Sequence, residues 1–377
     1  MKAVGLVTEY NPFHNGHIYH IQKSKEITNA DVVIAVMSGN FVQRGIPAIA
    51  DKWERTKVAL ENGVDIVIEL PIYYALQPAH IFANGAINLL SEIQVNDIAF
   101  GAENPNIDFI NLAKNKIEDE KHFFEDKTQT FASSFANALE SKTGFKLEES
   151  NDILAFTYAK AIVDRKLEKQ IKIHPIARKN AAYKDFQLND TNIASATAIR
   201  LAIDENKDIA RFTPMNNFFK RAEYEEKLFD LLFYRLSTDG VKQLKQIYQM
   251  NEGLEYRIKD VVENGVDNFP DLLNGIKSKR YTASRIHRLL VYSLLNIKVD
   301  QMQAALKEPY LRLLGYTNNG QKYLNEKKRE IKLPMITHVD LKLAKSNLRL
   351  DYKAGVLYNQ LMNIKDPQDI GRIPISQ

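Results

Sequence analysis

Residues 3–17, AVGLVTEYNPFHNGH, decide the fold, because they place a strand, a loop and a helix start in direct succession. The apolar run AVGLVT predicts a short buried strand. The loop that follows contains a proline and a glycine, and HIYHIQKSKEIT (17–28) has the three and four spacing of apolar residues that predicts a helix. A loop that connects a strand to a helix start directs backbone N–H groups towards bound anions. Both His14 and His17 lie at this junction.

The succession of strand and helix repeats through the first half of the chain. Further strands are predicted in DVVIAVMSG (31–39), VDIVIELP (64–71), VNDIAFGAE (95–103) and QIKIHPIAR (170–178). A helix is predicted in DKWERTKVALENG (51–63), where Gly63 is a plausible helix stop. Short Val- and Ile-rich runs alternating with helices are typical of α/β proteins with right-handed crossovers. The sequence therefore predicts a Rossmann-like open parallel sheet in residues 1–200, which ends in a helix capped by Ser195.

The second half has a different pattern. Long helix-like stretches begin with FFKRAEYEEKLFDLLFYRLS (218–237) and include TASRIHRLLVYSLLNI (282–297). They predict a mainly α-helical domain over residues 201–377, with a small mixed segment around YLRLLGY (310–316) and LPMITHV (333–339). Residues 103–150 are the least regular part of the first half and are interpreted as a helical insertion over the sheet.

Composition restricts the chemistry. The 377 residues are 45% hydrophobic and 26% charged, which is typical of a globular protein, and they exceed the roughly 250 to 300 residues at which single cores stop growing. Because cysteine is absent, disulfides, thiolate metal sites and a cysteine nucleophile are excluded, and a reducing cytoplasm is expected. The start MKAVGLVTEY has no signal-peptide pattern, and no run of about eighteen apolar residues predicts a membrane span.

Basic residues are concentrated in the second half. Residues 1–200 contain 22 basic and 25 acidic side chains, and the remaining residues contain 29 and 22. The basic excess indicates either a surface for a polyanion or a solvated helical face.

The two histidines have three interpretations. Imidazoles one helical turn apart can share a metal ion, but no third ligand has an obvious spacing, so no metal site is predicted. They can also be capping and packing residues at a helix start. Their position after the first strand favours a third role, as hydrogen-bond donors to a phosphate during displacement of pyrophosphate.

A second phosphate site is predicted in IASATAIR (193–200). Ser195, Thr197 and the helix dipole would hold distal phosphates, and Arg200 or Lys179 would neutralise their charge. The alternative is a capped helix without a ligand. The two motifs belong to one α/β domain, as a site at the strand ends requires.

The element HNGH in this context is similar to the signature of the nucleotidyltransferase superfamily that includes class I aminoacyl-tRNA synthetases. Further stretches, in order GLVTEYNPFHNGHIYHI, VMSGNFVQRGIPAIADKWERTKVAL, GVDIVIELP, FGAE, NDILAFTYAKAI and SATAIR, resemble the bacterial tRNA(Met) cytidine acetate ligase family over nearly the whole chain. The resemblance implies that acetate and ATP give acetyl-adenylate and pyrophosphate. The acetyl group would then pass to N4 of the wobble cytidine of elongator tRNA(Met), giving N4-acetylcytidine, with ATP as substrate and Mg²⁺ bound to the nucleotide.

The resemblance also implies a set of site residues. His14 and His17 are expected to be catalytic. The expected ATP contacts are Val7, Thr8, Glu9, Tyr10, Asn11, Pro12, Phe13, His14, Asn15, Gly16, His17, His20, Gly101, Asn151, Arg178, Ser195 and Thr197. Gly101 and Asn151 also have structural interpretations, as a turn glycine and a helix N-cap.

Two further groups complete the expected site. Asn40, Gln43 and Arg44 of SGNFVQRG follow the second strand and are assigned to acetate or the adenylate, with a surface turn as the alternative. The basic cluster in KSKRYTASRIHR is assigned to tRNA, with an exposed helix start capped by Thr282 or Ser284 as the alternative. It contains Lys277, Lys279, Arg280, Arg285 and Arg288.

One stretch departs from the family pattern. After Arg178 the family has a glycine-containing turn resembling GAGYHD, whereas this chain has KNAAYKD, from Lys179 to Asp185. The missing glycine affects any phosphate contacts that the backbone of this loop makes.

Two rival functions remain at this level. One is another adenylyltransferase that acts on a small cofactor precursor, and the other is a non-catalytic RNA-binding protein with a retained nucleotide pocket. Sequence spacing does not determine the small acid, the identity of the tRNA or the oligomeric state.

Overall fold

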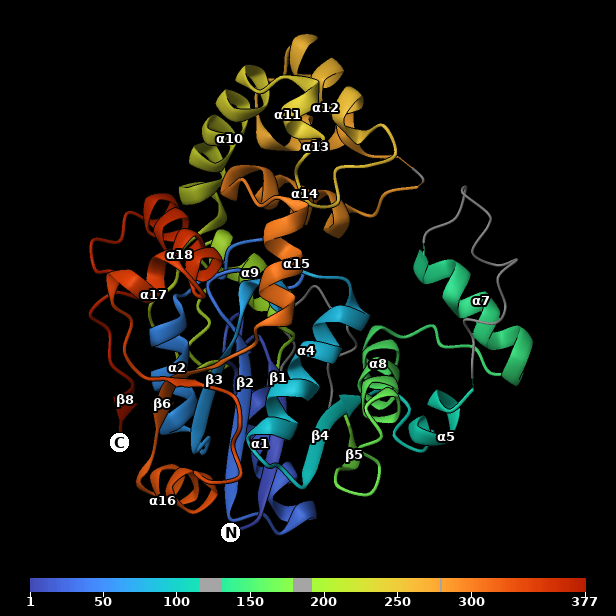
Figure 1. The fold of residues 1–377 in the computed structure, drawn as a ribbon, viewed down its shortest axis with the longest axis vertical. Coiled ribbons are helices and arrows are strands. Elements are labelled where there is room, and N and C mark those ends of the chain that lie inside the picture. The colour runs from blue at the N-terminus through green and yellow to red at the C-terminus, as the bar shows by residue number, and fades with distance from the viewer. Residues whose placement is uncertain (116–130, 179–191, 279) are drawn as a thin grey trace.

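The molecule is built on one twisted sheet, in which the strands from the first half of the chain are parallel to one another (Figure 1). The computed structural model describes residues 1–115, 131–178, 192–278 and 280–377. The strands of the first half are β1 (Ala3–Thr8), β2 (Val32–Ser38), β3 (Ile66–Leu70), β4 (Asp97–Ala102) and β5 (Lys172–Ala177). They are parallel and lie in the order β5-β4-β1-β2-β3. All five strands were predicted, and the α/β fold with a helical region after it is confirmed.

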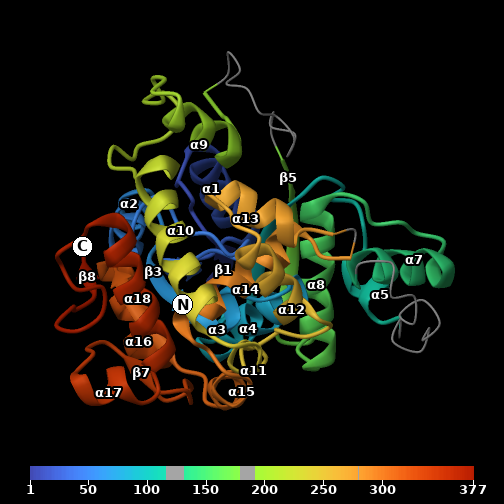
Figure 2. The ribbon, with the colours of Figure 1, turned by 90° about the horizontal axis from the view of Figure 1, so that it is seen from above.

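Helices cover both faces of the sheet. The helices of the first half are α1 (Asn15–Thr28), α2 (Lys52–Glu61), α3 (Ile72–Ala75), α4 (Ala79–Glu92), α5 (Phe109–Ala113), α7 (Phe131–Thr143), α8 (Ser150–Asp164) and α9 (Ala196–Asp204). Because successive strand side chains alternate, Val4 and Leu6 pack with the side chains of α1 and α2, whereas Ala3 packs with those of α4 and α8. Figure 2 shows these two helical layers on opposite sides of the sheet.

The least regular segment of the first half is helical where the structure describes it. α5 and α7 lie beyond α8 at one side of the molecule (Figure 1), and α5 packs on α8. Residues 116–130 lie outside the described residues.

The second half is mainly helical, as predicted. Its helices are α10 (Arg221–Thr238), α11 (Val241–Leu244), α12 (Leu254–Glu263), α13 (Phe269–Ile276), α14 (Ala283–Leu295), α15 (Val299–Lys307), α16 (Asn318–Lys327), α17 (Leu341–Lys345) and α18 (Arg349–Met362). Its strands are β6 (Leu311–Tyr316), β7 (Met335–Ile336) and β8 (Ile375–Ser376). None of the helices in the described ranges is long and apolar enough to cross a membrane.

The mixed segment of the second half belongs to the sheet of the first half. β6 pairs with β3 in the antiparallel direction, and β7 and β8 pair with β6. The buried ammonium of Lys52 in α2 contacts Glu69 of β3 at 2.8 Å and Asp369 of the C-terminal segment at 2.6 Å. The predicted domain boundary at residue 200 stays a prediction. The two halves that it separates share a sheet and a buried ion cluster.

Candidate active site

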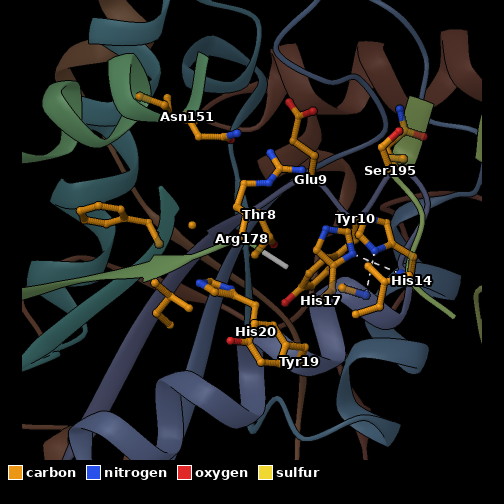
Figure 3. A pocket seen from close by; sticks show the side chains of 18 of the residues that line it. Thr8, Glu9, Tyr10, His14, His17, Tyr19, His20, Asn151, Arg178 and Ser195 are labelled. Carbon is orange, nitrogen blue, oxygen red and sulfur yellow. Dashed lines mark hydrogen bonds between the residues drawn. The ribbon is translucent and has the colours of Figure 1, made fainter. Parts of the chain in front are cut away.

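A cavity of about 320 Å³ lies at the carboxyl ends of β1, β4 and β5 (Figure 3). The chain proceeds from β1 to β2 and β3 on one side and places β4 and β5 on the other. Such a reversal of strand order leaves a crevice beside the first strand, which is the usual ligand site of open α/β sheets. The cavity brings together most of the predicted ATP contacts. They are Val7, Thr8, Glu9, Tyr10, Asn11, His14, Gly16, His17, His20, Gly101, Asn151, Arg178, Ser195 and Thr197.

His14 and His17 begin helix α1, and their hydrogen bonds fix their tautomers. His14 is the N-cap, and its Nδ1 accepts from the Gly16 N–H at 3.1 Å. The Nδ1 of His17 accepts from the His14 N–H, also at 3.1 Å, and the two rings stack with centroids 3.7 Å apart. Because a neutral imidazole has one N–H, an accepting Nδ1 leaves that proton on Nε2. Both histidines are therefore donors through Nε2.

The site keeps its imidazoles neutral. Burial, with the positive charges of Arg178 and Arg200, lowers the pKa of His14 to about 3. Burial and the neighbouring histidines hold the pKa of His17 well below its usual range, and burial beside Arg178 lowers that of His20 to about 4. Neutral donors suit a phosphate whose charge grows during displacement, because they need no proton from solvent.

Gly16 is required because the His14 ring lies directly against it. A Cβ at this position would lie 2.8 Å from Cε1 and 2.9 Å from Nδ1 of the His14 ring. Any larger residue would displace the capping imidazole. The glycine of the His-x-Gly-His element thus permits the His14 cap, in addition to the close phosphate approach expected from the sequence.

A second helix N-terminus reaches the same cavity. Ser195 is the N-cap of α9, as predicted, and its Oγ accepts from the Ala198 N–H at 3.1 Å. Arg200 donates from Nη1 to the Asn11 carbonyl at 2.6 Å and from Nη2 to Thr197 Oγ1 at 3.0 Å, so it joins this helix to the β1 loop. The positive ends of two helix dipoles therefore converge where phosphates are expected. Lys179, the alternative cation, and the whole Lys179–Lys184 departure lie outside the described residues.

The opposite wall contains Gly101, Asn151 and Arg178. An acidic residue that the sequence did not single out, Glu103, links Asn151 to Arg178. Asn151 Nδ2 donates to Glu103 Oε1, and Arg178 Nη1 lies 3.8 Å from the same oxygen. Asn151 is inside α8, whose N-cap is Glu149, so the N-cap interpretation is wrong. The FGAE motif contained the signal for Glu103, because its acidic residue directly follows a strand end.

Three residues of the β1 loop are outside the lining of the cavity and support it from behind. Phe13 is fully buried against Tyr10, with ring centroids 4.7 Å apart. Asn15 donates from Nδ2 to the carbonyls of Asn192 and Arg211 at 2.8 and 2.9 Å. Pro12 follows a cis peptide bond. The contacts of Phe13 and Asn15 hold the loop in place.

The SGNFVQRG segment connects the cavity to the helical half. The Gln43 N–H donates to Glu9 Oε1 at 2.7 Å, and the Gln43 carbonyl accepts from Arg288 Nη1 at 3.1 Å. Gly45 has a φ of +80°, and a Cβ there would lie 2.3 Å from the backbone nitrogen of Arg288. The loop is thus locked onto α14, and it is not a free surface turn.

The three residues assigned to acetate are separated by the fold. Asn40 is buried, bonds to Lys52 N and Gln368, and borders a void of about 10 Å³, which is the size of a single water. Gln43 Nε2 donates to the Gln77 carbonyl at 3.0 Å. Arg44 lines a second cavity beside Arg200. An acetate role stays a prediction for all three residues.

The basic cluster is also divided. Arg280 and Arg285 pair with Glu252 at 3.0 and 3.1 Å, and both guanidinium groups lie over the Tyr281 ring. Arg288 is buried on the SGNFVQRG loop, Lys277 is exposed and Lys279 lies outside the described residues. Thr282 caps α14. A tRNA role therefore stays a prediction for Lys277, Arg280 and Arg285, and for Arg288 the structure shows a packing role.

Arg55 is a positioning residue that sequence reasoning missed. This fully buried side chain of α2 donates to the carbonyls of Glu9 at 2.6 Å, Ser38 at 2.9 Å, Ala50 at 2.9 Å and Gly39. It therefore ties together the carboxyl ends of β1 and β2. An arginine on the apolar face of DKWERTKVAL was the available signal.

The fold and the cavity define a class, the α/β nucleotidyltransferases. The sequence model of the family described as HIGH Nucleotidyl Transferase matches residues 1–371. The tRNA(Met) cytidine acetate ligase of Oenococcus oeni is 55% identical over 376 residues, which are 100% of both chains. The tRNA(Met) cytidine acetate ligase of Limosilactobacillus reuteri is 43% identical over 380 residues, and the match covers 100% of this chain and 99% of that protein. The chain belongs to the tRNA(Met) cytidine acetate ligase family, which confirms the resemblance.

Solved structures agree with this assignment. Thermotoga maritima TmcAL in its apo form has a TM-score of 0.89 and 31% identity, and the match covers 100% of this chain and 99% of the other. The same protein bound with alpha-thio ATP has a TM-score of 0.87, 30% identity and the same coverage.

Proposed function

We propose that the protein is an ATP-dependent acetate ligase that acetylates N4 of the wobble cytidine of elongator tRNA(Met). In the first step an acetate oxygen attacks the α-phosphorus of ATP, and pyrophosphate leaves. In the second step N4 attacks the acetyl carbon, AMP leaves with the bridging oxygen, and N4 releases a proton. The family membership and a relative bound with alpha-thio ATP support this reaction.

The observation that carries the proposal is the pair of neutral Nε2 donors at the start of α1. We assign His14 and His17 to the α-phosphate oxygens, where negative charge increases as the new P–O bond forms. The α1 dipole adds a fixed positive field at the same place. No covalent enzyme intermediate is needed, because positioning and electrostatics suffice for nucleotidyl transfer.

The remaining walls suggest how ATP lies. The start of α9, with Ser195 and Thr197, is assigned to the β- and γ-phosphates. The adenosine is assigned to the wall of Gly101 and Asn151, where a Cβ on Gly101 would meet only the Arg178 side chain, at 3.5 Å. Arg178 is placed to bind phosphate or ribose oxygens.

We expect Mg²⁺ to arrive with ATP and to be held mainly by phosphates and water. In the described part of the chain no group of three His, Asp or Glu side chains forms a metal site, and Glu9 is the single acidic residue among the described lining residues. A tRNA substrate implies that the protein acts in the cytoplasm.

Acetate-dependent exchange of pyrophosphate into ATP tests the first step, and mass spectrometry of elongator tRNA(Met) incubated with protein, ATP and labelled acetate tests the second. We expect exchange and labelled N4-acetylcytidine. Pyrophosphate exchange without labelled cytidine would indicate an adenylyltransferase that acts on another acceptor. ATP binding without exchange, whatever carboxylic acid is supplied, would leave a non-catalytic nucleotide-binding protein.

A further inference from the structure

A second cavity adjoins the first. It measures about 450 Å³ and lies between α9 of the first half and α10, α13 and α14 of the second. Figure 1 shows α10, α13 and α14 together in the upper part of the molecule, with α9 below them. The two cavities lie on either side of the α9 start, and Thr197 and Arg200 line both of them. A molecule in the second cavity would therefore face the start of α9, which the pyrophosphate leaves before acetyl transfer.

Aromatic rings form one wall of this second cavity. The rings of Phe269 and His287 stack with centroids 5.9 Å apart and planes 16° apart, and Tyr224 is buried nearby. Burial lowers the pKa of His287 to about 4, so its ring is a neutral surface. Unpaired nucleobases bind to such walls, because every base has a π face that stacks on aromatic side chains.

The lining of the second cavity contains both positively and negatively charged side chains. Arg44, Arg200 and Arg221 contribute positive charge, and Arg221 is more than half exposed at the mouth. The Asp204 carboxylate accepts from the Arg221 N–H at 2.9 Å. Glu225 is half-buried in the lining, and its carboxylate has no hydrogen-bond partner among the described residues. Burial raises the pKa of Glu225, and the positive charge of Arg221 opposes this rise.

We propose that this cavity is the acceptor site, which holds the extruded wobble cytosine between the aromatic wall and Glu225 during acetyl transfer. The inference rests on the proposed function and adds the position of its second substrate. Carboxylates are the side chains that accept from the cytosine N4 amine, and uracil lacks that donor. A wobble base lies in a single-stranded loop, where extrusion costs little. Arg221 at the mouth is suited to the flanking phosphates.

Two substitutions test the site by separating the two half-reactions. Glu225→Ala removes the acceptor for N4, and Ser284→Phe fills the cavity from α14. Both are expected to lower kcat/KM for tRNA acetylation by roughly 10- to 100-fold, which is the effect of losing one charged hydrogen bond or one stacked base. Acetate-dependent pyrophosphate exchange should remain within about two-fold of wild type, since the first cavity keeps all its contacts. Glu226→Ala is the matched control, because Glu226 is exposed on the same helix and outside the cavity lining.

A crosslink locates the base directly. A tRNA(Met) transcript with 5-iodocytidine at the wobble position is irradiated with the wild-type protein, and the crosslinked residue is identified by mass spectrometry. Attachment to Phe269, His287 or Tyr224 supports the site. Attachment to the first cavity or to the exposed face around Lys277 overturns it.

Failure of this inference is distinguishable from failure of the proposed function. A wild-type protein that makes no acetylcytidine refutes the reaction itself. A wild type that acetylates tRNA, with Glu225→Ala and Ser284→Phe both as active as Glu226→Ala, retains the reaction and removes the acceptor site.

Discussion

At the scale of single residues, His14 has two roles that the sequence could not separate. Its Nδ1 caps α1 through the Gly16 N–H, and its Nε2–H is available to the cavity. The packing interpretation and the phosphate interpretation of this histidine are therefore compatible, because they use different nitrogens.

A substitution that keeps one role and removes the other tests this division. In His14→Asn the side-chain oxygen can still cap the helix, since asparagine is among the best N-cap residues, but the distal donor is lost. We expect pyrophosphate exchange to fall by about 10²-fold or more, as for the loss of one preorganised donor, with an unchanged melting temperature. A variant that melts normally and exchanges at the wild-type rate would refute the α-phosphate role.

The neutral imidazoles predict a pH dependence of stability. The pKa values of His14 and His20 are lowered to about 3 and 4 in the folded protein, whereas unfolded histidine titrates near 6.5. Below about pH 6.5 the unfolded state binds more protons, so the free energy of unfolding should fall as pH decreases towards 4. Urea unfolding at a series of pH values measures the slope.

The same titration has a spectroscopic check. Imidazole NMR signals of His14 and His20, assigned by substitution, should show no titration step between about pH 8 and 5, and those of His14 should show the Nε2–H tautomer. A step near 6.5 would mean that the site tolerates an imidazolium, and the donor argument would have to be revised.

At the scale of elements, Arg55 determines how the loops after β1 and β2 meet. Its guanidinium donates to the backbone carbonyls of Glu9, Ser38, Gly39 and Ala50, which belong to both loops and to the end of β2. In Arg55→Lys the single ammonium cannot reach all four with its three donors. We expect the free energy of unfolding to decrease by about 2–4 kcal/mol, which is the cost of losing charged hydrogen bonds in a buried site.

Lys57→Met is the control for this prediction, because Lys57 is exposed on the same helix. Measured by chemical denaturation, the free energy of unfolding of Lys57→Met should lie within about 0.5 kcal/mol of the wild-type value. Equal stabilities for the two variants would show that Arg55 is replaceable and that the loops are held by other contacts.

At the scale of the whole molecule, the two halves share one sheet and one buried charge cluster. Without residues 201–377, β3 would lose its pairing with β6, and Lys52 and Glu69 would lose Asp369. We expect residues 1–200 expressed alone to be aggregated or unfolded by circular dichroism and gel filtration, because an exposed edge strand and an incomplete buried ion cluster are both unfavourable. A monomeric fragment with cooperative unfolding would support the predicted boundary as a true domain boundary.

The sequence by itself determined the strands, the two helix starts at the cavity and most of the residues that line it. These features are local, because strand runs, caps such as Ser195 and the His-x-Gly-His element depend on neighbours within a few residues. Only the tertiary structure decided the roles of Arg55, Glu103 and Arg288, the separation of Asn40 from the cavity, and the place of β6 beside β3. Each of these depends on contacts between segments far apart in the chain, and a residue type alone does not reveal its distant partner. The second cavity has the same origin, since α9 and α14 meet only after folding.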